Sequence, residues 1–196
     1  MWEQRYGTDD YIYGTEPNEF LRASLDDLPM GQVLCLAEGE GRNAVFLAES
    51  GRSVTSVDLS PSGVDKTRRL ATERSVQVDA TVGDLTDFDL GEAQWDLIVS
   101  SFAHVPAALR RDLHARVVTA LRPGGVLLLE AYTPDQLGRG TGGPSSEALM
   151  MTLAGLREEL APLEFVHGEE LEREIHEGLG HTGTGSVVQV IARKSN

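Results

Sequence analysis

The sequence has one cysteine, few basic residues and no long apolar run, and each shortage excludes a class of protein. Cys35 is the only cysteine among 196 residues, so neither a disulfide framework nor a zinc cluster is expected, and no HExxH spacing offers another metal site. Lys and Arg number 17 against 31 Asp and Glu, a formal net charge of −14. Because nucleic-acid affinity depends on basic side chains that neutralise phosphates, no nucleic-acid partner is expected.

The lack of long apolar stretches also bears on the cellular location of the protein. No stretch approaches the roughly 20 apolar residues of a membrane span, and the opening residues lack the apolar centre of a signal peptide. A chain of this length fits one domain. We therefore expect a single cytoplasmic domain over 1–196 without a membrane partner. Its parts are an N-terminal lid and helix (1–28), βα units (32–131), and a loop, a helix and a terminal antiparallel strand pair (132–196).

Apolar periodicity and turn residues predict alternating strands and helices through the first two thirds of the chain. Strands are predicted at 32–37, 53–58, 76–82, 95–100 and 126–131, and helices at about 17–28, 41–50, 62–74 and 107–121. This alternation specifies a parallel sheet with right-handed crossovers and helices on both faces. The Arg and Asp residues of the helix at 107–121 are expected to face water, and His114 and His167 are expected at the surface.

After residue 132 the alternation stops. A Gly-rich loop (132–146) and a short helix (about 149–160) precede a charged segment (163–175) and an apolar one (185–193). The charges suit an exposed sheet edge. Because the loop between the two segments is too short for a helical crossover, we expect an antiparallel pair whose second member lies beside the fifth strand.

The most informative stretch is the turn Ala37-Glu38-Gly39-Glu40-Gly41-Arg42-Asn43, which joins an apolar strand to a helix. Its glycines allow a ligand to approach the backbone, and Asp58, at the end of the next strand, can accept from both hydroxyls of a ribose. The turn also matches the GxGxxA dinucleotide fingerprint. However, Glu38 and Glu40 would lie where a pyrophosphate must bind, whereas a cationic sulfonium tolerates them. Gly83-Asp84-Leu85, after the third strand, offers polar recognition of adenine, so the pattern favours S-adenosylmethionine.

In the order of these motifs the chain resembles the class I S-adenosylmethionine-dependent methyltransferases. The corresponding segments are Ala37–Gly41 (motif I), Asp58, Gly83-Asp84 (motif II), Trp95–Ser100 (fourth strand) and Leu121–Gly125 (motif III). Ala37-Glu38 departs from the family's more common Gly-Cys, which is a small obstacle if the φ of Ala37 is negative. The resemblance implies an α/β, doubly wound, Rossmann-like sheet of seven strands in the order 3-2-1-4-5-7-6, with strand 7 antiparallel. It places the cofactor across the carboxyl ends of strands one, two and four.

The two ends of the chain are similar to a small, single-domain branch that includes tellurite-resistance and thiopurine-type methyltransferases. The similar segments are Trp2–Tyr6, Tyr11–Asn18, Glu174–Gly178 and His181–Gly183. The resemblance implies a cytoplasmic enzyme that moves a methyl group to a small-molecule acceptor and releases S-adenosylhomocysteine, with no metal. The acceptor would be a thiol, a chalcogen oxyanion or another heteroatom, and the enzyme a monomer or homodimer.

The expected cofactor site draws on several loops, and some of its residues have two interpretations. Trp2, Tyr6, Tyr11 and Tyr13 either close over the cofactor, their ring faces attracted to the sulfonium, or merely pack the first helix. Asp58 and Asp84, the acids after strands two and three, either bind the cofactor or are solvated. Glu38 either meets the cofactor's ammonium or is an exposed turn carboxylate, and Asn43 supports the turn. The full set is Trp2, Tyr6, Tyr13, Ala37, Glu38, Gly39, Gly41, Asn43, Asp58, Leu59, Gly83, Asp84, Leu85, Ser100, Ser101 and Phe102.

Histidines and one arginine are the candidates for contact with the acceptor. His104 follows the fourth strand and is the first of them, although a surface or capping role is equally open. His176, His181 and Arg139 form a second cluster in which a cation would hold an oxyanion or carboxylate, unless their proximity is coincidental. Because methyl transfer from a sulfonium mainly requires alignment and exclusion of water, a catalytic base is optional.

Two other functions remain open at this stage. An NAD(P)-dependent oxidoreductase would bind NADH tightly and would not bind S-adenosylhomocysteine. A non-catalytic S-adenosylmethionine-binding module would bind the cofactor but methylate no acceptor.

Overall fold

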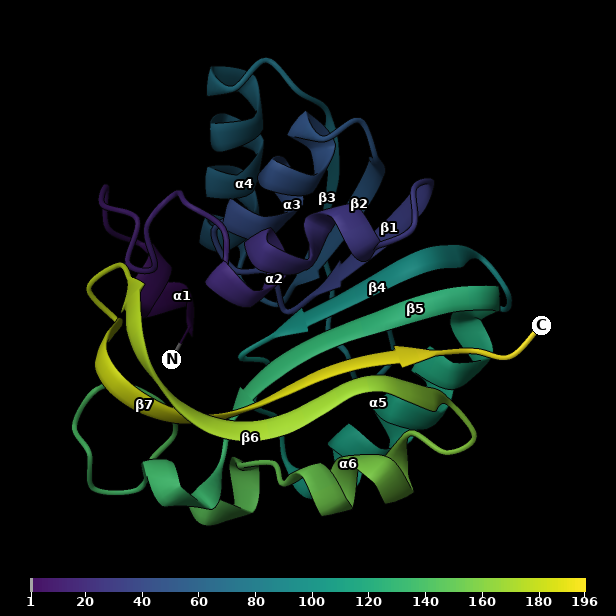
Figure 1. Ribbon diagram of the computed structural model, residues 1–196. Helices are drawn as coiled ribbons and strands as arrows, with labels where there is room; N and C mark the ends of the chain where they lie inside the picture. The colour runs from purple at the N-terminus through teal and green to yellow at the C-terminus, as the bar shows by residue number, and fades with distance from the viewer. Residues whose placement is uncertain (1) are drawn as a thin grey trace.

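The computed structural model describes residues 2–196, which form a seven-stranded sheet with helices on both faces (Figure 1). The strand order is β3-β2-β1-β4-β5-β7-β6. The parallel strands are β1 (Gln32–Leu36), β2 (Ser53–Asp58), β3 (Val78–Val82), β4 (Trp95–Ser101) and β5 (Leu121–Tyr132). Strand β7 (His181–Arg193) is antiparallel to β5 and to the edge strand β6 (Glu164–Glu177). The predicted fold class, strand order and antiparallel seventh strand are confirmed.

The helices lie in two layers, and each layer has its own core. Helices α2 (Glu19–Ser24), α3 (Arg42–Glu49) and α4 (Pro61–Glu73) lie over one face, and α5 (Ala107–Ala120) and α6 (Leu153–Glu159) over the other (Figure 1). Side chains alternate along a strand, so Cys35 of β1 packs with α2 and α3 whereas Leu34 packs with α5 and α6. Short 3₁₀ turns occupy Leu25–Asp27, Pro134–Gln136 and Glu147–Leu149. Burial on both faces leaves the strand ends as the place where a ligand can reach the sheet.

Polar side chains cap the N-termini of several of these helices. Ser60 accepts from the backbone N–H of Gly63 at the start of α4, and Thr152 accepts from Gly155 at the start of α6. The Thr152 cap explains why α6 begins later than predicted. The predicted helix at 17–28 is shorter too, because α2 ends at Ser24 and continues only as a 3₁₀ turn.

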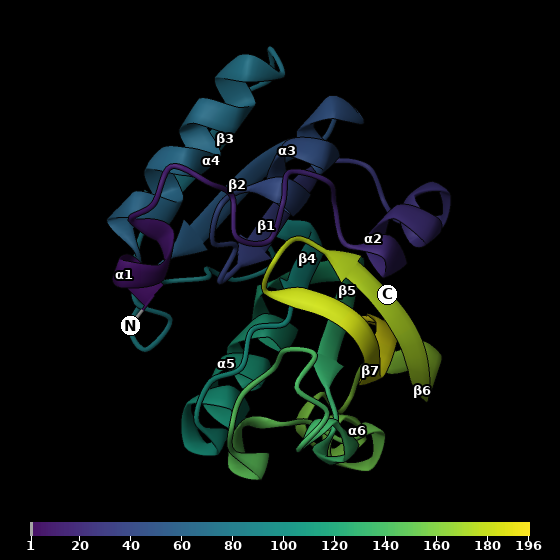
Figure 2. The same ribbon diagram turned by 90° about the vertical axis from the view of Figure 1, so that its left-hand side faces the viewer.

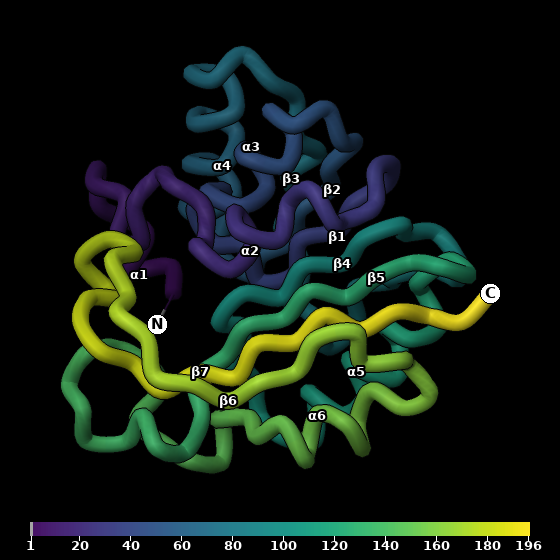
Figure 3. The backbone as a smooth tube through the Cα atoms, in the orientation of Figure 1, coloured from purple at the N-terminus to yellow at the C-terminus, as the bar shows by residue number. Residues whose placement is uncertain are grey.

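The N-terminal helix α1 (Trp2–Tyr6) was not predicted as an element. It lies beside α4 (Figure 2), where the carboxylate of Glu3 accepts from the hydroxyls of Ser60 and Ser62. Residues 12–14 then run next to the loop that joins β6 to β7 (Figure 3), and the backbone N–H groups of Leu179 and Gly180 donate to Ile12. The N-terminal segment and the end of the β6–β7 hairpin therefore support each other.

Expectations about surface residues fail at the contact between α5 and α6. His114 is buried, with its Nδ1 2.7 Å from Glu159 Oε2, and Arg110 forms an ion pair with the same carboxylate at 2.8 Å. Burial raises the pKa of Glu159, but hydrogen bonds from His114 and Arg110 outweigh it and hold that pKa at about 2. His167 is partly buried as well, with its ring centroid 5.5 Å from that of Phe20. The periodicity of α5 indicates which of its positions are charged. It does not reveal that their partner, Glu159, lies on another helix, α6.

Within residues 2–196, no helix is long and apolar enough to cross a membrane.

Candidate functional site

A cavity of about 220 Å³ opens at the carboxyl ends of the parallel strands. In open α/β sheets this edge is where ligands bind. The N-terminal segment and the start of β7 complete its walls. The lining residues are Trp2, Tyr6, Tyr13, Ala37, Glu38, Glu40, Arg42, Asn43, Asp58, Leu59, Gly83, Asp84, Leu85, Ser101, Phe102, Ala103, His104, Val105, Leu109 and His181. Most of the predicted cofactor set is among them, but Gly39, Gly41 and Ser100 are not.

The glycines of the motif I turn serve close packing. A Cβ on Gly41 would lie 2.7 Å from the backbone of Thr67 in α4, and one on Gly39 would lie 2.7 Å from the hydroxyl oxygen of Tyr6. Ala37 has a φ of +47°, so the condition under which its methyl group would be a small obstacle, a negative φ, is not met. The left-handed conformation costs an alanine about 1–2 kcal/mol, which the surrounding structure must offset.

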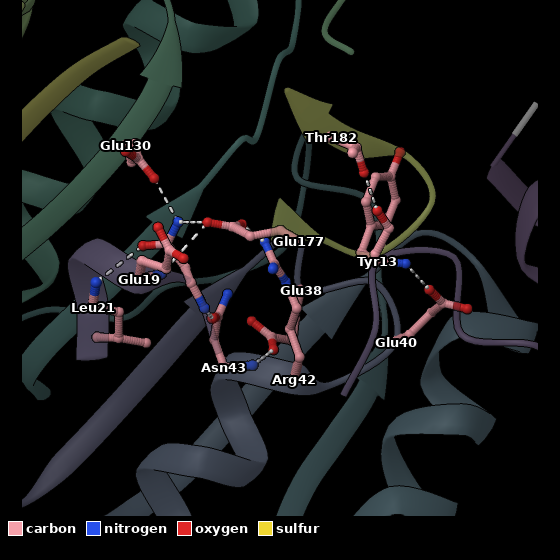
Figure 4. A network of polar contacts seen from close by, with 12 residues as sticks. Tyr13, Glu19, Leu21, Glu38, Glu40, Arg42, Asn43, Glu130, Glu177 and Thr182 are labelled. Carbon is pink, nitrogen blue, oxygen red and sulfur yellow. Dashed lines mark hydrogen bonds and ion pairs between the residues drawn. The ribbon is translucent and has the colours of Figure 1, made fainter. Parts of the chain in front are cut away.

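Glu38 occupies the N-terminus of α3. Its Oε1 accepts from the backbone N–H groups of Asn43 and Ala44, both at 2.8 Å (Figure 4). Burial raises the pKa of this carboxyl to about 7, although the two donors and Arg42 act in the opposite direction. An exposed turn carboxylate is therefore the wrong interpretation of Glu38. The N–H groups that would bind a diphosphate at a helix start are already occupied by this side chain.

Glu40 is buried and paired. Its Oε1 lies 2.6 Å from Lys66 Nζ in α4, and its Oε2 accepts from the backbone N–H of Tyr13 at 3.2 Å. The pair balances the charge of Glu40 and fixes the segment that carries Tyr13. Tyr11, predicted to be part of the lid, is not among the lining residues, because its hydroxyl donates to the backbone oxygen of Lys66.

Asp58 and Asp84 lie at the ends of neighbouring strands and differ in environment. Asp58 is buried, and its two carboxylate oxygens accept from the backbone N–H groups of Gly39 and Ser60, each at 2.8 Å. Burial raises its pKa. Asp84 is exposed, and a hydrogen bond from the backbone of Thr86 lowers its pKa. Each Asp58 oxygen keeps a lone pair for a further donor, such as a ribose hydroxyl.

Aromatic rings cover the cavity from the N-terminal side. Trp2 stacks on Tyr6 with ring centroids 5.7 Å apart, Tyr6 meets Tyr13 edge to face at 6.4 Å, and Tyr13 lies 4.6 Å from His181. Trp2, Tyr6 and Tyr13 thus both line the cavity and pack against one another. Their closing over a cofactor stays a prediction.

His104 lines the cavity, but both its ring nitrogens are used. Nδ1 donates to the backbone oxygen of Leu149 at 2.9 Å, and Nε2 accepts from the backbone N–H of Tyr132 at 3.2 Å. Burial lowers the pKa of His104 to about 4. The side chain is therefore a neutral structural link between β5 and the segment before α6, and it offers a ligand only ring carbons.

The predicted cluster of His176, His181 and Arg139 is not assembled. Arg139 pairs with Glu172 at 2.5 Å, His176 is exposed, and neither lines the cavity. Because side chains alternate along β6 and Ile175 is buried, His176 must face outward. Only His181, which belongs to β7, reaches the cavity.

A buried charged network that sequence reasoning missed lies beside the cavity (Figure 4). Glu177 accepts from Arg42 at 2.5 Å, from Arg173 at 2.6 Å and from the Asn18 amide at 3.0 Å. Arg173 also pairs with Glu130 at 2.8 Å, so two acids balance two bases. Burial raises the pKa of Glu177, but Arg42 and Arg173 outweigh it and lower that pKa. Arg42 directly follows the glycine turn, and this position was a signal that the sequence offered. Its partner Glu177 lies 135 residues later and is one of several glutamates in β6, so the sequence did not distinguish it.

Three lining residues carry a buried polar atom that has no hydrogen-bond partner within residues 2–196. These atoms are Arg42 Nη1, Ser101 Oγ and His181 Nδ1. The ring of His181 packs against that of Tyr132, whose buried hydroxyl also has no hydrogen-bond partner among the described residues. Because an unsatisfied buried polar group costs about 1–3 kcal/mol, this end of the cavity suits a polar ligand.

Comparisons with known proteins bear on this site. Residues 33–125 match the family described as a methyltransferase domain. A 2-heptyl-1-hydroxyquinolin-4(1H)-one methyltransferase of Mycobacteroides abscessus is 28% identical over 141 residues, which cover 68% of this chain and 62% of that protein. Other curated relatives are named as tRNA or ribosomal-protein methyltransferases. The chain spans less than two thirds of the length of the curated relatives it matches.

Solved structures match over nearly the whole chain. A structure described as "Conversion of a Disulfide Bond into a Thioacetal Group during Echinomycin Biosynthesis" has a TM-score of 0.79 at 19% identity, covering 98% of this chain and 88% of its own. TehB from Haemophilus influenzae has a TM-score of 0.73 at 20% identity, covering 99% of this chain and 66% of its own. At these identities the likeness shows the fold.

The fold is a Rossmann-like α/β sheet, and its cavity at the carboxyl ends of the strands is the candidate ligand site. Residues 33–125 of this fold are similar to a methyltransferase domain.

Proposed function

We propose that this protein transfers the methyl group of S-adenosylmethionine to a small-molecule acceptor in the cytoplasm, acting as one domain over residues 1–196. The observation that carries the proposal is the position of Glu38, whose carboxylate takes the N–H groups at the start of α3. A diphosphate would have to displace this acid, whereas a sulfonium gains from it. The lone, buried Cys35 suits a reducing compartment.

The lining residues fit each part of this cofactor. Asp58 has lone pairs for the ribose hydroxyls, and the unpartnered Nη1 of Arg42 suits the cofactor's carboxylate. Leu59 and Leu85 give an adenine ring apolar walls, beside the exposed acid of Asp84. When bound, the cofactor supplies an activated methyl group. The chain's own residues then align the acceptor, while Trp2, Tyr6 and Tyr13 keep water out.

A small acceptor is supported by size and by charge. The cavity of about 220 Å³ is roofed by aromatic rings, and the chain has a net charge of −14. Both features oppose a polyanionic acceptor such as tRNA. The aromatic N-terminal segment also favours the small, single-domain branch of methyltransferases that includes tellurite-resistance and thiopurine-type enzymes, as a monomer or homodimer.

The test is a methyl-transfer assay on the purified full chain with methyl-labelled S-adenosylmethionine. The panel contains thiols, phenols, amines, selenite, tellurite and a 1-hydroxyquinolin-4-one, the last taken from the name of the mycobacterial relative. Formation of S-adenosylhomocysteine with at least one acceptor is expected. Binding of S-adenosylhomocysteine without turnover on any acceptor would favour the non-catalytic module instead.

A further inference from the structure

The end of the cavity formed by Tyr13, Phe102 and His181, here called the acceptor end, is aromatic, and no unpaired cation lines the cavity within residues 2–196. His181 lies 4.6 Å from the ring of Tyr13 and 4.5 Å from that of Phe102, centroid to centroid. A Cβ on Gly180 would lie 2.4 Å from the Tyr13 ring, so the glycine allows ring and hairpin to meet. Burial first, and then the charge of Arg42, lower the pKa of His181 to about 3, so its imidazole is neutral at physiological pH.

The charges around this end disfavour an anionic acceptor. Arg42 and Arg173 are each paired with the carboxylate of Glu177, and Lys66 is paired with Glu40. The other lining charges are the acids Glu38, Asp58 and Asp84. His176 and Arg139, which would have held an oxyanion, lie outside the cavity. The lining thus has surplus acid, which attracts a cationic cofactor and repels a second anion.

Two polar atoms of the lining nevertheless require a partner. Ser101 Oγ and His181 Nδ1 are buried and have none within the part of the chain that the structure describes. They come from the end of β4 and the start of β7; Ser101 directly precedes Phe102 in the sequence, and the ring of His181 packs against that of Phe102. A group that both donates and accepts a hydrogen bond satisfies a hydroxyl and a neutral imidazole together, which a bare anion does not.

We propose that the acceptor is an uncharged molecule with an O–H or S–H group, which hydrogen-bonds to His181 and Ser101 between the walls formed by Tyr13 and Phe102. This inference rests on the proposed methyltransferase function and names its substrate class. Nδ1 of His181 accepts from the acceptor's O–H or S–H, and the Ser101 hydroxyl donates to a lone pair on the same atom.

The methyl transfer is balanced without a charged base. A second lone pair of the acceptor's oxygen or sulfur forms a bond to the methyl carbon while the carbon–sulfur bond of the sulfonium breaks. The electron pair of that bond stays on sulfur and yields the neutral thioether. The methylated acceptor at first carries the positive charge together with its proton, and it is far more acidic than an imidazolium, so the proton passes along the existing hydrogen bond to Nδ1 of His181. The imidazolium releases this proton to solvent water when the products leave, so the positive charge lost by the sulfonium ends as one proton in solution and His181 returns to its neutral form.

The experiment compares neutral and anionic probes with the full chain and three variants. The neutral probes are 2-mercaptoethanol, benzyl mercaptan and phenol, and the anions are selenite, tellurite and benzoate. His181→Phe and Ser101→Ala remove the two polar atoms. His176→Phe is the matched control, because it makes the same change on the outer face of the same hairpin. Calorimetric binding of S-adenosylhomocysteine shows that each variant retains its fold and cofactor site.

We expect turnover on a neutral probe and none on the anions. His181→Phe should lose about tenfold or more in kcat/KM, the scale of one lost hydrogen bond to a buried group, with Ser101→Ala showing a smaller loss. Binding of S-adenosylhomocysteine should stay within about threefold for both, and His176→Phe should match the wild type, as expected of a surface change. Methylation of selenite or tellurite in preference to every neutral probe, or wild-type rates for His181→Phe, overturns the inference while leaving the methyltransferase function in place. Failure of the wild type to bind S-adenosylhomocysteine overturns both.

Discussion

At the scale of single residues, the proposed choice of cofactor rests on the carboxylates around the cavity. Glu38 takes the helix N-terminus, Glu40 is paired with Lys66, and Asp58 keeps lone pairs for a new donor. The three acids thus play different parts although they lie within a few residues of two strand ends. Their separate surroundings, rather than their shared charge, determine what each one binds.

Replacing Asp58 with Ala should weaken the binding of S-adenosylhomocysteine by about 1–3 kcal/mol, the scale of losing a buried hydrogen-bond pair. The measurement is isothermal titration calorimetry. Asp79→Ala is the control, because Asp79 is an exposed acid on the neighbouring strand β3. An affinity equal to that of the wild type would mean that the ribose binds elsewhere.

Glu38→Gln should change how stability depends on pH. The carboxyl has a pKa of about 7 in the folded chain and about 4.5 as its ordinary value. The wild type should therefore lose stability relative to the glutamine variant as pH rises from about 4.5 through 7, by an amount on the order of 1–3 kcal/mol. Urea unfolding of both proteins at pH 5 and pH 8 measures this difference. Parallel pH profiles would show that Glu38 remains charged throughout.

The positions of candidate site residues were predicted correctly from the sequence where the neighbouring strand alone sets them. Asp58 ends β2 and Phe102 directly follows β4, so the sheet alone places them at the cavity. His176 was misplaced because its orientation depends on the register of β6. His104 lies at the cavity as predicted, but the use of its ring nitrogens could not be predicted, because its partners Leu149 and Tyr132 are distant in sequence. The left-handed φ of Ala37 had no sequence signal, since alanine rarely adopts it.

At the scale of elements, the β6–β7 hairpin and the N-terminal segment form the closed side of the site together. Backbone hydrogen bonds join Ile12 to Leu179 and Gly180, and the network around Glu177 joins the hairpin to α3 and to Asn18. A buried ion pair contributes little to stability when intact but is costly to break, because the partner stays buried and charged.

Glu177→Ala should therefore destabilise the protein by about 3–5 kcal/mol, since it leaves Arg42 without its partner and Arg173 with only part of its own. The free energy of unfolding, measured in urea, provides the test. Glu169→Ala changes an exposed glutamate on the same strand and should stay within about 0.5 kcal/mol of the wild type. Equal, small effects of the two substitutions would contradict a structural role for the network.

The elements themselves were largely predictable, and the exceptions have local causes. Long periodic segments such as α4 and α5 lie within a residue or so of the predicted ranges, because their apolar stripes face a sheet. Helix α1 escaped prediction because five residues are too few to show a period, and tertiary contacts through Glu3 support it.

At the scale of the whole molecule, the net charge and the strand order both favour a cationic ligand at the carboxyl ends of the strands. The strand order follows from the alternation of elements and the family resemblance. It brings the loops after β1, β2, β3 and β4 to one edge of the sheet. The net charge of −14 belongs to the whole chain, and on average it attracts a cation and repels polyanions.

The chain should accordingly show no saturable binding to bulk tRNA at physiological salt, because too few basic residues are present to release counterions. A filter-binding or fluorescence-polarisation titration would measure this. Binding below about 1 µM that weakens linearly with the logarithm of salt concentration would contradict the prediction and favour an RNA acceptor.

The central claim is that the acid-capped start of α3 admits a sulfonium nucleoside and excludes a dinucleotide. Calorimetric titration of the purified full chain with S-adenosylmethionine, S-adenosylhomocysteine and NADH tests it most directly. The structure predicts saturable binding of the first two at one site per chain and no heat of binding for NADH. Tight binding of NADH without binding of either sulfur nucleoside would contradict the account.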